Sequence, residues 1–175
     1  PNGDGGAAVI ITRHERALDM VPQPIRIAGS ALATDTLALH DRKDMLHLRA
    51  AELSAQRAMA AAGVSHDDID LFELHDSFTV MAALSLEATG FAAAGAGWQL
   101  ARDEEIGRNG RIPISTFGGL KARGNPGGAT GMYQIVEVAR QLRNQAGDNQ
   151  ITDAKIGMAQ SLGGSGATAG THILQ

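Results

Sequence analysis

Two short polar motifs stand out in a chain that is otherwise rich in small and apolar residues. His75 and Asp76 follow an apolar run, and Asn125 lies between a glycine and a proline in Gly124-Asn125-Pro126. Each motif falls where a predicted strand gives way to a predicted helix. An imidazole and a carboxamide delivered from such junctions can donate hydrogen bonds to one substrate oxygen. The pair therefore predicts chemistry that stabilises an enolate or a thioester oxyanion, as in carbon–carbon condensation or thiolysis.

Each motif taken alone also has an ordinary structural interpretation. His75 can simply cap a strand by bonding to backbone, and an Asn-Pro pair can form a turn before a helix. Proline disfavours the α conformation for Asn125, so an extended backbone would aim its side chain. In open α/β sheets, ligands collect beyond the carboxyl ends of strands, and this favours the functional interpretation when both motifs occur.

A third polar segment, Ser161–Gly166, is rich in glycine and joins the last two predicted strands. Its backbone N–H groups could form an anion nest or an oxyanion hole, and the alternative is a tight turn. Neither a phosphate-binding loop nor a dinucleotide-binding fingerprint fits, because the required glycine and lysine spacing is missing. No metal site is expected, since metal-ligand spacing is absent around the other histidines, which are His14, His40, His47, His66 and His172.

Composition limits the classes of function. The 175 residues fit one domain, and a net charge of −4 gives no reason to expect nucleic acid or an anionic membrane. No apolar run reaches the length of a transmembrane helix, so the cytoplasm is the expected location. Without cysteine, the chain can form neither disulfides nor a cysteine nucleophile of its own. The start at Pro1 suggests that the sequence is a fragment.

Alternation of apolar runs with helical patterns predicts a layered α/β fold over residues 1–175. Asp76 is expected to cap the helix that follows it. Residues 128–143 are apolar on most sides, which predicts a second covering layer supplied by another domain or chain. Strands or extended runs are expected at 6–12, 25–33, 69–74, 112–115, 154–159 and 167–174. Helices are expected at 13–20, 46–62, 77–89, 98–105 and 128–143.

Four segments in this order resemble the C-terminal half of the thiolase superfamily. Residues 4–8 resemble the first strand of that half, and residues 69–78 its strand and catalytic loop. Residues 118–131 resemble the Gly-His-Pro loop with the central helix, and residues 159–164 the closing Cys-x-Gly loop. The resemblance covers nearly the whole chain. It is strongest to the sterol-carrier-protein (lipid-transfer-protein) and archaeal types of thiolase.

The resemblance implies a mixed five-stranded sheet with helices on both faces, and an N-terminal half that carries a nucleophilic cysteine. Coenzyme A would enter as part of an acyl-CoA substrate, with no separate cofactor. The superfamily usually forms dimers, and members of this type often work with a zinc-ribbon and OB-fold partner protein. His75 and Asn125 would form one oxyanion site and the Gly163 N–H a second. Three residues are implied as substrate contacts: Ser77, Phe78 and Gly119.

Two departures from the family pattern leave other functions open. Degradative thiolases have Asn in the first loop and His in the second, whereas this chain has His75 and Asn125, an exchange that resembles type III ketoacyl synthases. Serine stands at positions 77 and 161, where the family places a second cysteine as the base. Because a serine hydroxyl is a far weaker base than a thiolate, the alternatives are a catalytically reduced acyl-CoA or lipid binder, or an aldolase on the thiolase fold.

Overall fold

The computed structural model describes residues 2–175, in which two main helices pack on opposite faces of a four-stranded sheet. The strands are β1 (Ile27–Thr34), β2 (Leu71–Glu73), β3 (Gly157–Gly163) and β4 (Thr168–Leu174). The α-helices are α1 (His14–Met20), α2 (Arg49–Ala62), α3 (Thr79–Ala88), α4 (Gly97–Arg102), α5 (Gly119–Arg123) and α6 (Thr130–Leu142). Short 3-10 turns are η1 (Leu39–Asp41), η2 (His66–Asp68), η3 (Gly127–Ala129) and η4 (Gly147–Asn149).

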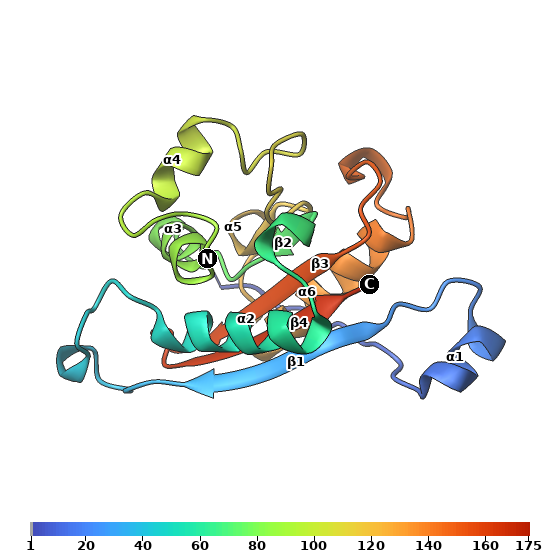
Figure 1. Ribbon diagram of the computed structural model, residues 1–175, viewed down its shortest axis with the longest axis horizontal. Helices are drawn as coiled ribbons and strands as arrows, with labels where there is room; N and C mark the ends of the chain where they lie inside the picture. Colours follow the sequence, from blue (N-terminus) through green and yellow to red (C-terminus); the bar gives the residue numbers. More distant parts are fainter. Residues whose placement is uncertain (1) are drawn as a thin grey trace.

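The strand order is β1-β4-β3-β2, with β3–β2 parallel and the other two pairs antiparallel. Helix α2 covers one face of the sheet and α6 covers the other. Figure 1 shows the strands lying between these two helices. Adjacent residues of β3 confirm the two faces, because Met158 packs in the core under α2 and Ala159 in the core under α6. The predicted mixed α/β fold is therefore confirmed.

The predicted count of five strands is wrong. Residues 6–12 adopt no strand, and the side chains of Ile10 and Ile11 are 85% and 73% exposed. An apolar run specifies burial but not a partner strand, and within residues 2–175 this run finds none. The predicted extended run at 112–115 forms only a single bridge, between Ile114 and Phe72 of β2.

Close backbone contact places α2 on the sheet. A Cβ atom added to Gly29 of β1 would lie 2.0 Å from the carbonyl oxygen of Ala58 in α2, so only glycine fits there. Helix α2 ends at Gly63, which has φ of +69° as the sequence predicts for a C-cap. Across residues 2–175, no helix combines the length and the apolar character that crossing a bilayer requires.

Candidate oxyanion site

The first candidate donor, His75, lies two residues beyond the end of the short buried strand β2. Its side chain is half-buried, and its Nδ1 atom is buried without a hydrogen-bond partner among residues 2–175. Burial lowers the pKa of His75 below 6.5, the Asp76 carboxylate acts against this shift, and the Arg123 guanidinium adds to it. His75 is therefore a neutral imidazole at pH 7 and can donate one hydrogen bond.

Asp76 joins the His75 loop to α5. The expected role of Asp76 as a helix cap is wrong, because α3 begins after Phe78 and has no side-chain cap. The Asp76 Oδ1 atom instead accepts a hydrogen bond of 2.8 Å from the Leu120 N–H. Gly119 is needed for this contact, since it has φ of +57° and an added Cβ would lie 2.4 Å from the Asp76 carboxylate. Gly119 thus allows the start of α5 to lie close to the Asp76 carboxylate.

The second candidate donor, Asn125, directly follows Gly124, the C-cap residue of α5. Its Oδ1 atom accepts hydrogen bonds from the Gly127 N–H at 3.1 Å and from the Thr130 hydroxyl at 3.0 Å. Because the oxygen is held by two donors of the same chain, the amide nitrogen is the group left to donate to a ligand. The N-terminal segment also reaches this loop, as the Gly3 N–H donates to the Asn125 carbonyl at 3.2 Å.

Helix α5 brings the two loops close together. Its start is docked on Asp76, next to His75, and its end leads into Asn125. A five-residue helix is only about 7.5 Å long. The charge of Arg123, the last residue of α5, also acts on the His75 ring. The backbone segments that carry His75 and Asn125 thus meet the two ends of one short helix.

The third predicted segment lies at the start of α6. Ser161 of β3 packs against Gly131, where an added Cβ would meet the Ser161 hydroxyl at 3.3 Å. Gly163 is the exposed last residue of β3, opposite Thr168 of β4. The turn that follows has Gly164 at φ +56° and Gly166 at φ +81°. The closing loop is therefore a tight glycine turn, and Ser161, which precedes it in β3, lies against the start of α6.

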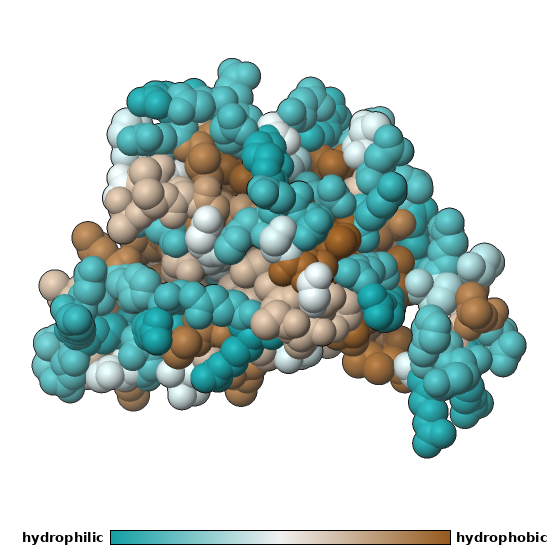
Figure 2. Space-filling view, viewed as in Figure 1, coloured by the Kyte–Doolittle hydropathy of each residue, from teal (hydrophilic) through white to brown (hydrophobic). Residues whose placement is uncertain are grey.

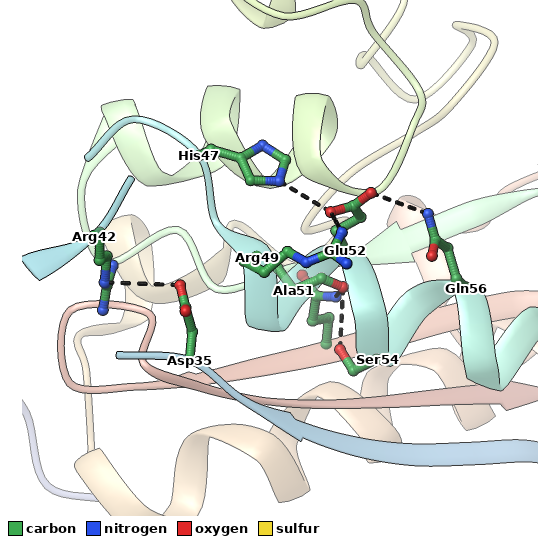
Figure 3. Close-up of polar contacts among 9 residues, drawn as sticks. Asp35, Arg42, His47, Arg49, Ala51, Glu52, Ser54 and Gln56 are labelled. Carbon is green, nitrogen blue, oxygen red and sulfur yellow. Dashed lines mark hydrogen bonds and ion pairs between the residues drawn. The ribbon is translucent and has the colours of Figure 1, made fainter. Parts of the chain in front are cut away.

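A buried arginine holds this turn from the segment between β1 and α2. Arg42 donates to the Ser165 carbonyl at 3.0 Å, to the Ser165 hydroxyl at 3.3 Å and to the Thr36 carbonyl at 2.8 Å. Its side chain is almost fully buried and lies 3.9 Å from the Asp35 carboxylate (Figure 3). The sequence does not indicate this contact, because nothing in the local pattern around Arg42 links it to residue 165.

Two of the predicted substrate contacts, Ser77 and Phe78, differ in how exposed their side chains are. Ser77 is half-buried, and the Phe78 side chain is 68% exposed. A cavity of about 650 Å³ opens elsewhere, beside Ser115 and Gly118, and neither candidate donor lines it. Within residues 2–175, no cluster of His, Asp or Glu forms a group that could hold a metal ion.

A polar stripe on α6 was also missed. Four polar residues of this helix are buried: Thr130, Gln134, Glu137 and Gln141. The Gln134 amide donates to the Gln160 carbonyl of β3 at 2.9 Å. Their spacing of three or four residues was a readable signal for one helix face. The apolar residues of α6 are spread around the helix, and three of them, Met132, Ile135 and Val136, are half-exposed.

Comparison with known proteins identifies the family of this chain. Residues 31–175 match the family described as "Thiolase C-terminal domain-like". The chain belongs to this family. The resemblance to thiolases in the sequence is thereby confirmed.

Two curated relatives and one solved structure are similar to this member of the thiolase family. An acetyl-CoA acetyltransferase of Methanothermobacter thermautotrophicus is 42% identical over 99% of this chain and 45% of its own length. Sterol carrier protein 2 of Oryctolagus cuniculus is 32% identical over 98% of this chain and 32% of its own length. The solved structure of the "Ltp2-ChsH2(DUF35) aldolase" aligns with 92% of this chain and 42% of that one, with a TM-score of 0.84 and 27% identity. The chain thus spans less than half the length of the relatives it matches.

Proposed function

We propose that this chain is the C-terminal half of an acyltransferase of the thiolase type that acts on acyl-CoA thioesters. The observation that carries the proposal is the orientation of Asn125, whose oxygen is occupied by Gly127 and Thr130. The free carboxamide nitrogen and the neutral His75 ring would donate to the thioester oxygen. Donors fixed before the reaction stabilise a developing oxyanion most effectively.

In this proposal the reaction begins with a cysteine thiolate on the N-terminal half. The thiolate attacks the thioester carbonyl, a new carbon–sulfur bond forms, and coenzyme A leaves as its thiolate. His75 and Asn125 hold the oxygen of the thioester, or of the enolate formed from it. The Gly163 N–H would face the carbonyl oxygen of the acyl-enzyme. Ser77, Phe78 and Gly119 would lie along the pantetheine and acyl chain.

The whole protein would contain more than this chain. The relatives are more than twice as long as the stretch they share with this chain, which supports an N-terminal half with the nucleophile. The structural neighbour named Ltp2-ChsH2(DUF35) aldolase includes a DUF35 protein, and this supports a zinc-ribbon and OB-fold partner for this protein also. We propose in addition a homodimer, no separate cofactor beyond the coenzyme A of the substrate, and a location in the cytoplasm.

An aldolase is the second candidate, and two observations favour it. Serine replaces the second cysteine at positions 77 and 161, which removes the usual base for deprotonating the acceptor. The structural neighbour that is 27% identical to this chain is named as an aldolase. Retro-aldol cleavage would use His75 and Asn125 on an enolate oxygen and would need no acyl-cysteine. A binder of acyl-CoA or lipid without catalysis is the third alternative.

Mass spectrometry of the full-length protein after incubation with acetyl-CoA separates these candidates. We expect a covalent acetyl adduct on a cysteine of the N-terminal half. With an adduct formed, His75→Ala and Asn125→Ala should each slow turnover by about a hundredfold, the usual effect of losing an oxyanion donor. An unacylated protein that still cleaves a β-hydroxyacyl-CoA would support the aldolase instead. Unchanged turnover in both variants would refute the assignment of the site.

A further inference from the structure

A buried ionic cluster of Arg123, Glu137 and Glu73 adjoins the two segments that carry His75 and Asn125. The Arg123 Nε atom at the end of α5 is 3.4 Å from Glu137 Oε1 on α6. The Arg123 guanidinium also stacks on the ring of Tyr133, 4.8 Å from its centroid. Glu73, the last residue of β2, and Glu137 are only 1% and 6% exposed. Two carboxyl groups and one guanidinium are therefore packed where water cannot solvate them.

The two carboxyl groups have different roles in this cluster. Glu73 Oε1 accepts hydrogen bonds from the Thr116 N–H at 2.8 Å and the Thr116 hydroxyl at 2.9 Å. Burial, together with the charge of Glu137 beside it, raises the pKa of Glu73 well above 4.5. Burial also raises the pKa of Glu137, but the Glu73 hydrogen bond and Arg123 oppose that shift. The raised pKa favours the neutral form of Glu73, whereas the carboxyl group of Glu137 lies next to the Arg123 guanidinium, which favours its charged form.

We propose that Glu137 and Arg123 are positioning residues for the His75–Asn125 pair, with Glu73 as the second buried carboxyl group of their cluster. The inference rests on the proposed function. Arg123 lies two residues before Asn125, and Glu73 lies two residues before His75 along the chain. The cluster therefore ties both backbone segments that carry a donor to the same turn of α6. A shift of either segment by about 1 Å is enough to impair a catalytic geometry.

The charged and titratable groups around the cluster come from each element that packs on it. Glu137 faces Glu73 of β2, Arg123 of α5, Asp76 of the His75 loop and Arg140 of its own helix. Arg123 faces Glu137, the Tyr133 ring and His75. Removing the Glu137 charge would leave the Arg123 cation uncompensated beside the imidazole. Replacing the neutral form of Glu73 by glutamine would change no charge. The glutamine amide would also keep one donor and one acceptor for hydrogen bonds.

The test compares Glu137→Gln with the conservative Glu73→Gln in the full-length protein, with exposed Glu15→Gln as control. Two properties are measured: turnover of acetyl-CoA, and the pKa of His75 from the NMR shift of its ring, assigned with His75→Asn. We expect Glu137→Gln to lower kcat about tenfold or more with KM changed less than about twofold. It should also lower the pKa of His75. Glu73→Gln should resemble the control in kcat and in the pKa of His75.

Equal effects of the two glutamine variants, or a His75 pKa that Glu137→Gln leaves unmoved, would overturn the proposal. If Glu137→Gln does not fold, the double variant Arg123→Met/Glu137→Gln replaces it, since it leaves no unpaired buried charge. That double variant should fold and keep a low kcat; wild-type kcat would refute the positioning role. The pKa of His75 does not depend on turnover. A protein that forms no acyl adduct therefore refutes the proposed function. The pKa of His75 in Glu137→Gln still tests whether Glu137 and Arg123 act on the imidazole.

Discussion

At the scale of single residues, the candidate site is built from uncharged donors. Burial keeps His75 neutral at pH 7, and the Asn125 carboxamide does not titrate at all. An exchange of His and Asn between the two loops would therefore still leave one imidazole and one carboxamide to donate to the oxygen of the proposed substrate. Preorganised dipoles of this kind stabilise negative charge that develops during the reaction without holding a permanent ion. This explains why the exchange is compatible with the same role.

The raised pKa of Glu73 predicts a specific dependence of stability on pH. The folded state holds this proton more tightly than the unfolded state, whose carboxyl titrates near 4.5. Glu73 therefore contributes stability that is complete below about pH 4.5 and is lost as the pH rises through its folded pKa. Relative to wild type, Glu73→Gln should gain free energy of unfolding between pH 5 and pH 8. Urea denaturation at these two pH values measures the difference, and a constant difference would contradict the assignment of the proton.

Residue types in the motifs were readable from the sequence, but their contacts were not. The sequence indicated His75 and Asn125 because both follow predicted strands, and the structure places them at the two ends of α5. It also suggested that Asp76 caps a helix, whereas this carboxylate binds the Leu120 N–H, 44 residues away. A local rule cannot detect a partner at that separation.

At the scale of elements, the Arg42 side chain connects the segment between β1 and α2 to the turn at residues 163–166. We expect Arg42→Met to loosen this turn, because it removes hydrogen bonds of a charged donor that contribute about 1.5–3 kcal/mol each. Hydrogen exchange of the amides in residues 163–167 should become at least about tenfold faster, while exchange in β3 stays the same. Arg49→Met, which removes only an exposed ion pair with Glu52, is the matched control (Figure 3).

Unchanged exchange at residues 163–167 in Arg42→Met would show that the glycine turn is held by its own backbone. The acyl adduct gives a second measurement. If the Gly163 N–H contributes to an oxyanion hole, the rate of adduct formation should fall together with the protection of the turn.

Elements with strong local signals were predicted well, and elements defined by pairing were not. The helix that ends at Gly63 and the strands at 25–33 and 167–174 agree with α2, β1 and β4 within a few residues. The run at 6–12 has equal apolar character but no partner among residues 2–175. On α6, the buried face combines a polar stripe with apolar residues: Val138 is fully buried, and Ile135 and Leu142 pack against the same core. Apolar periodicity therefore predicts the apolar part of this face but not the buried polar residues beside it.

At the scale of the whole molecule, several large apolar side chains of the described residues lie on the surface. Figure 2 shows apolar residues reaching the surface between polar ones on this face. The exposed large apolar side chains include Ile10, Ile11, Leu18, Leu32, Leu37 and Leu46. Exposed apolar side chains are available to pack against another part of the protein. Such packing would agree with the proposed N-terminal half, because the chain spans only 45% of the length of the acetyl-CoA acetyltransferase that it matches.

The half-exposed apolar side of α6 gives a test of that cover. In the full-length protein, Val136→Asp should cost more than about 3 kcal/mol of unfolding free energy, because it would bury an unpaired carboxylate under the second half. In residues 1–175 alone, the same substitution should cost less than about 1 kcal/mol, since the carboxylate stays hydrated. Gln145→Asp, at an exposed position just beyond α6, is the control in both proteins. Equal costs of Val136→Asp in both would mean that nothing covers this side of α6.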